Sequence, residues 1–179
     1  PFTTSSLQQE ASRKLGFGVK KTMMVAQKLY EAGYITYMRT DSTRLSDDAK
    51  KMAKEYITDK FGKNYYLNRE FKAKENAQDA HEAIRPSHLD VEPELGRDEE
   101  KLYNLILNRF LASQMSVAVY DTTRIKVDVE DYIFHINGST IKFDGFMKLY
   151  IEGKDDKNKS RAENEEDDDD EERVLPEFE

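Results

Sequence analysis

Cysteine and tryptophan are absent from the sequence, and proline occurs only four times in 179 residues. Without cysteine the chain can form neither disulfides nor thiolate metal sites, which is compatible with a reducing cytoplasm. No segment approaches the roughly 20 consecutive apolar residues that span a bilayer. No G-x-x-x-x-G-K-[ST] phosphate loop is present, so nothing implies nucleotide hydrolysis. We therefore expect a cytoplasmic protein with no membrane partner.

The excess of negative charge is confined to the C-terminal part of the chain. Residues 1–90 hold 16 Lys and Arg against 12 Asp and Glu, and the remainder holds 12 against 24. The run ENEEDDDDEE at residues 163–172 has no apolar periodicity and predicts a mobile, self-repelling loop. Carboxylates in such a loop lack fixed ligand geometry, so no metal site is predicted there. The net charge of −8 thus leaves a nucleic-acid partner possible for the first half of the chain.

Four helices are predicted from apolar stripes at helical spacing, and they cover residues 5–15, 19–32, 47–61 and 98–114. Ser5 and Gln8 fit a capping box at the start of the first helix, and Gly16 is placed to end it. In the second helix, Tyr30 falls on an apolar row with Met23 and Ala26, which assigns it to the core. These two helices, joined by a short glycine turn, resemble a helix-turn-helix.

After Tyr120 the pattern changes to alternation, which is typical of strands. Turns are predicted at Glu130-Asp131, Asn137-Gly138 and Asp144-Gly145. The predicted fold class is therefore α+β: a mainly helical domain with a helix-turn-helix-like element, followed by a small antiparallel β meander. The predicted boundaries are residues 1–117 for the helical domain, 118–150 for the strands and 151–179 for an acidic, flexible loop and tail.

The segment GYITYMRTDST at residues 33–43 places a tyrosine and an arginine two positions apart. Ile35, Thr36 and Tyr37 follow a glycine that is typical of a helix end, so we expect a short strand here. In a strand, side chains at i and i+2 share a face, which would set the Tyr37 phenol beside the Arg39 guanidinium. A guanidinium can hold phosphate oxygens in two-point contact, and this pair is a candidate nucleophile with its electrostatic partner. On spacing alone, both residues fit ordinary packing and surface roles as well.

A second segment, ENAQDAHEAIRPS at residues 75–87, contains a histidine and an arginine four positions apart. If residues 76–84 are helical, His81 and Arg85 face the same side, and the helix ends against Pro86. Together the two side chains could hold one phosphate. An isolated helical histidine is more often only solvated or hydrogen-bonded, so this assignment also needs support from other residues.

These two segments, and the opening PFTTSSLQQEASRKLGFG, resemble the bacterial DNA topoisomerase I family, whose members are type IA topoisomerases. The run GFGVKKTMMVAQKLYEAGYITYMRTDST is similar to the family's active-site region, and HEAIRP lies in a second family signature. Both occur in the expected order and separation. The resemblance extends from Pro1 to about Tyr120 and then fades.

The resemblance implies a role for each matching residue. Tyr37 stands where the family has its nucleophile, which attacks single-stranded DNA and retains the 5′ end as a phosphotyrosine, and Arg39 matches an arginine that assists cleavage. His81 matches a histidine near the scissile phosphate, Gln27 and Glu31 fall at positions that line the same site, and Arg85 belongs to the same motif. The implied activity is ATP-independent relaxation of negatively supercoiled DNA by single-strand cleavage and religation.

The same resemblance implies parts that this chain lacks. Type IA enzymes use a separate N-terminal domain whose acidic cluster binds Mg²⁺, and no counterpart is present, so we predict no metal ligand and no cofactor within residues 1–179. The chain then reads as a monomeric fragment carrying the tyrosine-bearing domain and strands from a neighbouring arch domain. Its expected partners are single-stranded DNA and the missing N-terminal domain. We expect the fragment alone to be inactive.

Two other classes remain open from the sequence. A helix-turn-helix DNA-binding module without chemistry would explain the helical half. A structural or interaction domain would explain the acidic end. Neither alternative explains the two paired motifs.

Overall fold

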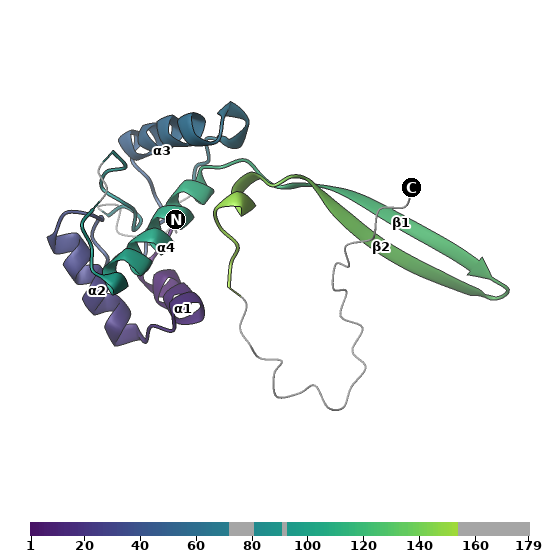
Figure 1. The fold of residues 1–179 in the computed structure, drawn as a ribbon, viewed down its shortest axis with the longest axis horizontal. Helices are drawn as coiled ribbons and strands as arrows, with labels where there is room; N and C mark the ends of the chain where they lie inside the picture. Colours follow the sequence, from purple (N-terminus) through teal and green to yellow (C-terminus); the bar gives the residue numbers. More distant parts are fainter. Residues whose placement is uncertain (72–80, 91–92, 154–179) are drawn as a thin grey trace. The chain divides into compact units, whose positions relative to one another are not determined.

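The computed structural model describes residues 1–71, 81–90 and 93–153 (Figure 1). Its main elements are α1 (Thr4–Leu15), α2 (Val19–Glu31), α3 (Asp47–Lys60), α4 (Arg97–Ser113), β1 (Val119–Val129) and β2 (Tyr132–Phe143). Short 3₁₀ turns cover Lys63–Tyr65 and Gly145–Lys148. Helices followed by an antiparallel pair of strands confirm the predicted α+β class. The predicted acidic run at 163–172 lies outside the described residues.

The chain divides into two compact units. The helical unit comprises the described residues of 1–116 together with 146–153, and the hairpin unit contains residues 117–145. The sequence pattern grouped residues 146–150 with the strands, whereas the contacts group them with the helices. The helical unit is therefore built from two separate stretches of chain.

The first helix begins earlier than the sequence predicts. Thr3 is its N-cap: the Thr3 side chain accepts a hydrogen bond from the Ser6 amide, and the Ser6 hydroxyl accepts one from the Thr3 amide. The predicted capping box at Ser5 and Gln8 is wrong because Thr3 already has the extended backbone that a cap requires, with φ −96° and ψ 171°. The predicted end is confirmed, since Gly16 closes α1 in the left-handed region at φ 66°.

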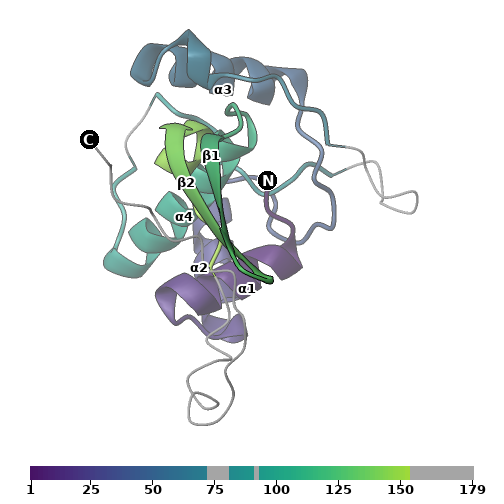
Figure 2. The same cartoon turned by 90° about the vertical axis from the view of Figure 1, so that its right-hand side faces the viewer.

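The core of the helical unit lies on both sides of α4. Figures 1 and 2 show α1 and α2 on one side of this helix and α3 on the other. The predicted apolar stripe of α4 is confirmed, because Leu102, Leu105, Ile106 and Phe110 are all buried. Leu102 and Ile106 pack with α1 and α2, whereas Phe110 packs with Ala53 and Ile57 of α3. None of the helices in the described ranges is long and apolar enough to cross a membrane.

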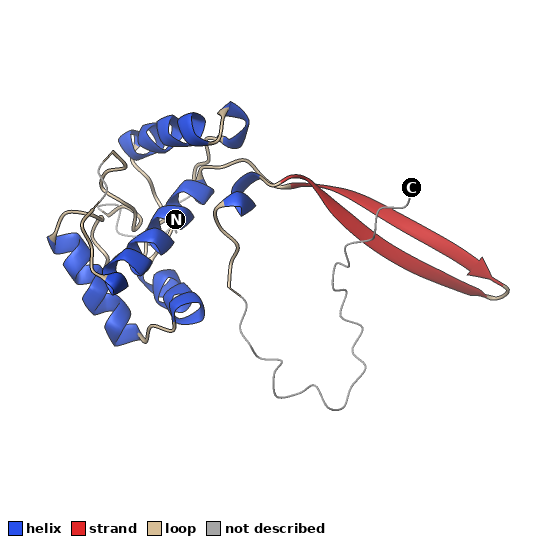
Figure 3. Cartoon of the chain, viewed as in Figure 1, coloured by secondary structure: helices blue, strands red, loops and turns tan. Residues whose placement is uncertain are grey.

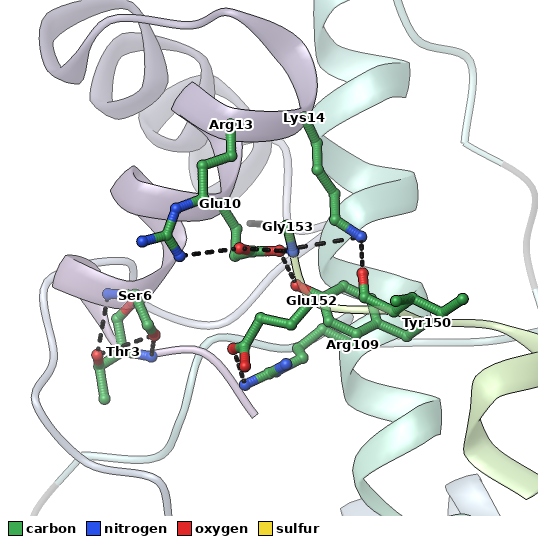
Figure 4. Close-up of polar contacts among 10 residues, drawn as sticks. Thr3, Ser6, Glu10, Arg13, Lys14, Arg109, Tyr150, Glu152 and Gly153 are labelled. Atoms are coloured by element: carbon green, nitrogen blue, oxygen red, sulfur yellow. Dashed lines mark hydrogen bonds and ion pairs between the residues drawn. The ribbon is translucent and has the colours of Figure 1, made fainter. Parts of the chain in front are cut away.

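A buried carboxylate fastens the returning segment 150–153 to α1 (Figure 4). Glu10 is only 2% exposed, and it accepts hydrogen bonds from the Tyr150 hydroxyl and, at 3.2 Å, from the Gly153 amide. The Arg13 guanidinium lies 3.4 Å from the same carboxylate and the Lys14 ammonium 3.9 Å. A buried carboxylate is stable only when its oxygens are paired in this way. The network therefore holds together segments that are 140 positions apart in sequence.

Arg109 of α4 extends this fastening. Its guanidinium lies 3.2 Å from a Glu152 carboxylate oxygen and 4.8 Å from the centroid of the Tyr150 ring. Burial and the hydrogen bond to Glu10 raise the pKa of Tyr150, so this phenol stays protonated as a donor. The segment after the hairpin is thus tied to both α1 and α4.

Glu10 should make the stability of the helical unit depend on pH. Burial raises the pKa of Glu10, but the bonds from Tyr150, Gly153 and Arg13 and the charge of Lys14 outweigh burial and leave the pKa below 4.5. A lowered folded-state pKa means that the stabilisation is present above the unfolded-state pKa and is lost as pH falls through the folded-state value. We expect Glu10→Gln to lower the unfolding free energy by about 2 kcal/mol at neutral pH. Chemical denaturation measures this loss.

Denaturation at a pH below the lowered folded-state pKa should show a smaller difference between Glu10→Gln and the original protein, since Glu10 is then protonated in both states. Glu55→Gln on the exposed face of α3 serves as the control and should change stability little at any pH. An equal loss in both variants would contradict the assigned role of Glu10.

The hairpin unit consists of two long antiparallel strands. Cα partners run from Val119 opposite Phe143 to Val129 opposite Tyr132, and the turn falls at Glu130 and Asp131 as predicted. Glu130 has φ 51°, which the tight turn requires. The predicted turn at Asn137-Gly138 is wrong, because both residues lie within β2 and pair with residues of β1. The Arg124 Nε–H donates to Asn137 Oδ1 at 3.0 Å and holds that residue in the ladder.

One face of the hairpin is apolar. Alternation puts six exposed side chains on it: Ile125, Val127, Val129, Tyr132, Phe134 and Ile136. The opposite face carries charged residues such as Arg124, Lys126 and Asp128. The alternation of apolar and polar residues therefore predicted that this region forms strands, but it did not predict the length of each strand.

Candidate active site

The segment between α2 and α3 is a loop, and the predicted strand over residues 35–37 does not form (Figure 3). Gly33, at φ 78°, ends the helical path, and only Ile35 then pairs, in a single bridge with Pro86. Side-chain hydroxyls, which the sequence pattern does not reveal, bond the backbone groups that a strand partner would otherwise take. Tyr37 and Arg39 are nevertheless both exposed, while Met38 between them is buried.

Thr36 brings the second predicted motif to Tyr37. The Thr36 amide donates to the Arg85 carbonyl at 2.9 Å, and its hydroxyl donates to the Ala83 carbonyl at 2.7 Å. The same hydroxyl accepts from the Arg85 amide at 3.0 Å. These bonds join residues almost 50 positions apart and set His81 beside Tyr37, with ring centroids 5.7 Å apart and planes inclined by 42°.

The Tyr30 ring also contacts the Tyr37 ring. Their centroids lie 5.2 Å apart at an interplanar angle of 64°, an edge-to-face arrangement. The sequence pattern placed Tyr30 in the core, but it is 40% exposed and Tyr37 is 38% exposed. Within the described ranges, the Tyr37 hydroxyl makes no hydrogen bond. Its ring is held by aromatic contacts, and the residue is exposed.

A cavity of about 350 Å³ is lined in part by His81, whose ring contacts that of Tyr37. Its lining includes the first residues of α1, the loop after Tyr37 and the imidazole: Thr4, Ser5, Arg39, Thr40, Asp41 and His81. Arg39 has no ion-pair partner among the residues that the structure describes. Arg39 and His81, from two distant motifs, thus line one cavity.

Arg85 and His81 are not one helical turn apart. Residues 81–84 have no helical hydrogen bonds and Ile84 bridges Phe2, while residues 76–80 of the predicted helix lie outside the described residues. The Arg85 guanidinium is engaged with its own segment: Nε donates to Glu82 at 2.8 Å and Nη1 to the Pro86 carbonyl at 2.9 Å. The prediction that His81 and Arg85 share one face of a helix is therefore wrong, because hydrogen bonds to Thr36 and Phe2 hold this segment in an extended conformation.

Gln27 and Glu31 lie on the last turns of α2, next to Tyr30. The Gln27 amide donates to the Glu31 carboxylate at 2.7 Å, and this pair is exposed. Their role in the site stays a prediction.

The site combines a phenol with two groups that can donate hydrogen bonds to an anion. An accessible phenol oxygen can attack an electrophilic phosphorus once its proton is removed, and a guanidinium and an imidazole N–H can stabilise the charge that develops. No group of three His, Asp or Glu close enough to bind a metal occurs in residues 1–71, 81–90 and 93–153. The described part of the chain thus provides no metal cluster.

Comparisons with known proteins identify the family of the chain. The model of a family described as DNA topoisomerase matches residues 1–177. The solved structure of full-length topoisomerase I from Thermotoga maritima is 43% identical, with a TM-score of 0.72. That match covers 86% of this chain and 29% of the Thermotoga chain, so this sequence corresponds to under a third of the length of that protein.

Proposed function

The chain belongs to the DNA topoisomerase family, and from this premise we propose that it carries the DNA-cleaving tyrosine of a type IA enzyme. In this proposal Tyr37 is the nucleophile, and Arg39 and His81 bind the scissile phosphate. The enzyme relaxes negatively supercoiled DNA in the cytoplasm, without ATP, by opening and resealing one strand.

One observation carries the proposal: the exposed Tyr37 ring contacts His81, and His81 lines one cavity together with Arg39. Most tyrosines bury their rings, and a buried hydroxyl usually finds a hydrogen-bond partner. Here aromatic contacts with Tyr30 and His81 fix the ring, and the oxygen is available for a substrate. This arrangement suits a nucleophile better than a packing residue.

The proposed step exchanges one phosphate ester for another. The Tyr37 oxygen forms a bond to phosphorus while the bond from phosphorus to the DNA 3′ oxygen breaks. The phenol loses its proton, and the departing 3′ oxygen gains one to become a hydroxyl. The 5′ end stays attached as a phosphotyrosine, and religation reverses the same exchange. Because no bond energy is lost to water, no nucleotide is consumed.

Arg39 suits the negative charge of this reaction. Its planar guanidinium can donate two parallel hydrogen bonds to phosphate oxygens, and among the described residues no carboxylate forms an ion pair with it. His81 can donate a further hydrogen bond from its ring. Gln27 and Glu31 would border the DNA strand, and Arg85 would act indirectly by holding the segment that carries His81.

Type IA enzymes also require Mg²⁺, and the residues described here do not fit that ion, because no acidic cluster is formed among them. We assign the magnesium ligands to an N-terminal domain outside residues 1–179. Bound there, the ion would contribute charge stabilisation, while the attack and the binding of the phosphate are assigned to Tyr37, Arg39 and His81 of this chain.

The isolated chain should form no covalent DNA adduct, because one wall of the proposed site is missing. Mixing it with the N-terminal domain, Mg²⁺ and single-stranded DNA should produce a denaturation-resistant adduct. The adduct should retain a 3′ label and lose a 5′ label, as a 5′-phosphotyrosine requires. Gel electrophoresis under denaturing conditions measures this.

Three outcomes would count against the proposal. An adduct formed by the isolated chain would refute the need for the second domain. Retention of the 5′ label would refute the polarity. DNA binding without any adduct in the mixture would favour the helix-turn-helix binding module.

A further inference from the structure

The hydroxyl of Thr4 forms hydrogen bonds with the backbone on both sides of Arg39. The Thr4 Oγ1–H lies 2.8 Å from the Met38 carbonyl and 3.1 Å from the Thr40 carbonyl, and Oγ1 accepts from the Thr40 amide at 2.9 Å. The Thr4 amide also donates to the Thr40 carbonyl at 2.9 Å. The residues immediately before and after Arg39 are thus bonded to one residue of α1.

The Thr4 hydrogen bonds replace the backbone hydrogen bonds that a neighbouring strand would provide. Residues 36–44 have no continuous β partner, and loop backbone without such bonds would sample many conformations. Thr40 and Ser42 continue the pattern, since the Ser42 amide donates to Thr40 Oγ1 at 3.0 Å and the Arg44 amide to Ser42 Oγ at 3.1 Å. Hydroxyl groups therefore hold the loop from Met38 to Arg44.

The position of Thr4 is itself well fixed. It is the first residue of α1, and the capping box between Thr3 and Ser6 sets the backbone on which it stands. Met38 and Thr40 are both buried, so the Thr4 contacts fix the inner side of the loop. The Arg39 side chain is left on the outer side, at the cavity.

We propose that Thr4 is a positioning residue for the cleavage reaction, acting through Arg39. Its hydroxyl fixes the backbone from which the guanidinium reaches the scissile phosphate, and so fixes the distance between guanidinium and phenol. The inference rests on the proposed function. It adds a residue that touches neither phosphorus nor the Tyr37 oxygen.

Thr4→Val is the variant that tests this proposal, in the full-length enzyme. Valine preserves the shape of threonine and removes only the hydroxyl. We expect about a tenfold fall in the single-turnover rate of covalent adduct formation, since small misplacements of a catalytic group cost this much or more. The dissociation constant for single-stranded DNA should change by less than about twofold, because charge contacts with phosphate remain. Thr4→Ser keeps the hydroxyl and should restore the original rate.

Thr22→Val is a matched control. It removes a buried hydroxyl of the same unit that donates to the Gly18 carbonyl at 3.1 Å and not to the loop backbone. This variant should keep the original cleavage rate even if it lowers thermal stability. A fall in rate for Thr4→Val that Thr22→Val does not share is a positioning effect and not a general loss of stability.

The inference would be overturned if Thr4→Val cleaved at the original rate, if Thr22→Val slowed cleavage equally, or if Thr4→Ser failed to restore the rate. A loss confined to DNA affinity would also overturn it. Tyr37→Phe is assayed in parallel: an adduct formed by that variant refutes the proposed function itself. Loss of the adduct in Tyr37→Phe, with full activity in Thr4→Val, refutes only the role of Thr4.

Discussion

Replacement of Tyr37 by phenylalanine is expected to abolish covalent linkage to DNA and to reduce relaxation at least about 1,000-fold, since the nucleophile is removed. The ring contacts with Tyr30 and His81 do not involve the hydroxyl, so the variant should keep them. Among the described residues the hydroxyl has no hydrogen-bond partner, and its removal leaves no buried group unpaired. We therefore expect unchanged thermal stability and unchanged affinity for single-stranded DNA. Relaxation assays and calorimetry measure both parts.

Tyr30→Phe is the matched control for this prediction. It removes a phenol oxygen from the same aromatic group, at a residue of nearly equal exposure. Only the Tyr37 oxygen attacks phosphorus in the proposed mechanism, so the Tyr30→Phe variant should relax DNA normally. Activity retained in Tyr37→Phe, or lost equally in Tyr30→Phe, would show that the nucleophile is misassigned.

Replacement of Arg39 by alanine should slow cleavage by about 100- to 1,000-fold, the usual effect of removing one preorganised group that stabilises developing charge. Arg39→Lys should restore only part of this loss, because an ammonium keeps the charge but cannot form two parallel bonds with a phosphate. Stability should hardly change, since the guanidinium has no ion-pair partner in the described ranges. Single-turnover cleavage at saturating DNA measures the effect separately from binding.

Arg97→Ala provides the control for a simple loss of positive charge. Arg97 is an exposed arginine at the start of α4 and does not line the cavity beside Tyr37. It should leave the rate of cleavage at saturating DNA unchanged. If Arg97→Ala and Arg39→Ala reduced this rate equally, Arg39 would contribute only long-range charge.

The helices were predictable because their signals are local. Ser46 precedes α3 and accepts from the Ala49 amide as an N-cap should, and Gly16 ends α1. The four residues predicted to form the apolar stripe of α4, Leu102, Leu105, Ile106 and Phe110, are all buried. In each case propensity, capping and periodicity indicate the same structure.

The path of the site was not predictable, because distant side chains decide it. Residues 35–37 have the composition of a strand, but the Thr36 hydroxyl bonds the backbone at Ala83 and Arg85, and Thr4 bonds the residues around Arg39. A pattern within eleven residues cannot reveal partners more than 30 positions away. The two motifs identified the residue types at the site, and long-range hydrogen bonds determine how these residues meet.

Two further differences have similar causes. Tyr30 occupies an apolar row of α2 by periodicity, yet the chain leaves the helix after Glu31 and turns so that Tyr37 reaches the exposed Tyr30 ring. Asn137-Gly138 has turn chemistry, but β1 provides a partner for both residues and the strand continues. Local preference was overridden in both cases by an available tertiary contact.

The most direct test of the central claim is to identify the amino acid that becomes linked to DNA. Full-length enzyme is trapped on single-stranded DNA, the complex is digested with protease and nuclease, and the nucleotide-bearing peptide is sequenced by mass spectrometry. The account predicts a 5′-phosphate ester on Tyr37. A nucleotide on Tyr30, on Tyr34 or on any other residue, or a link through a 3′ phosphate, would contradict it.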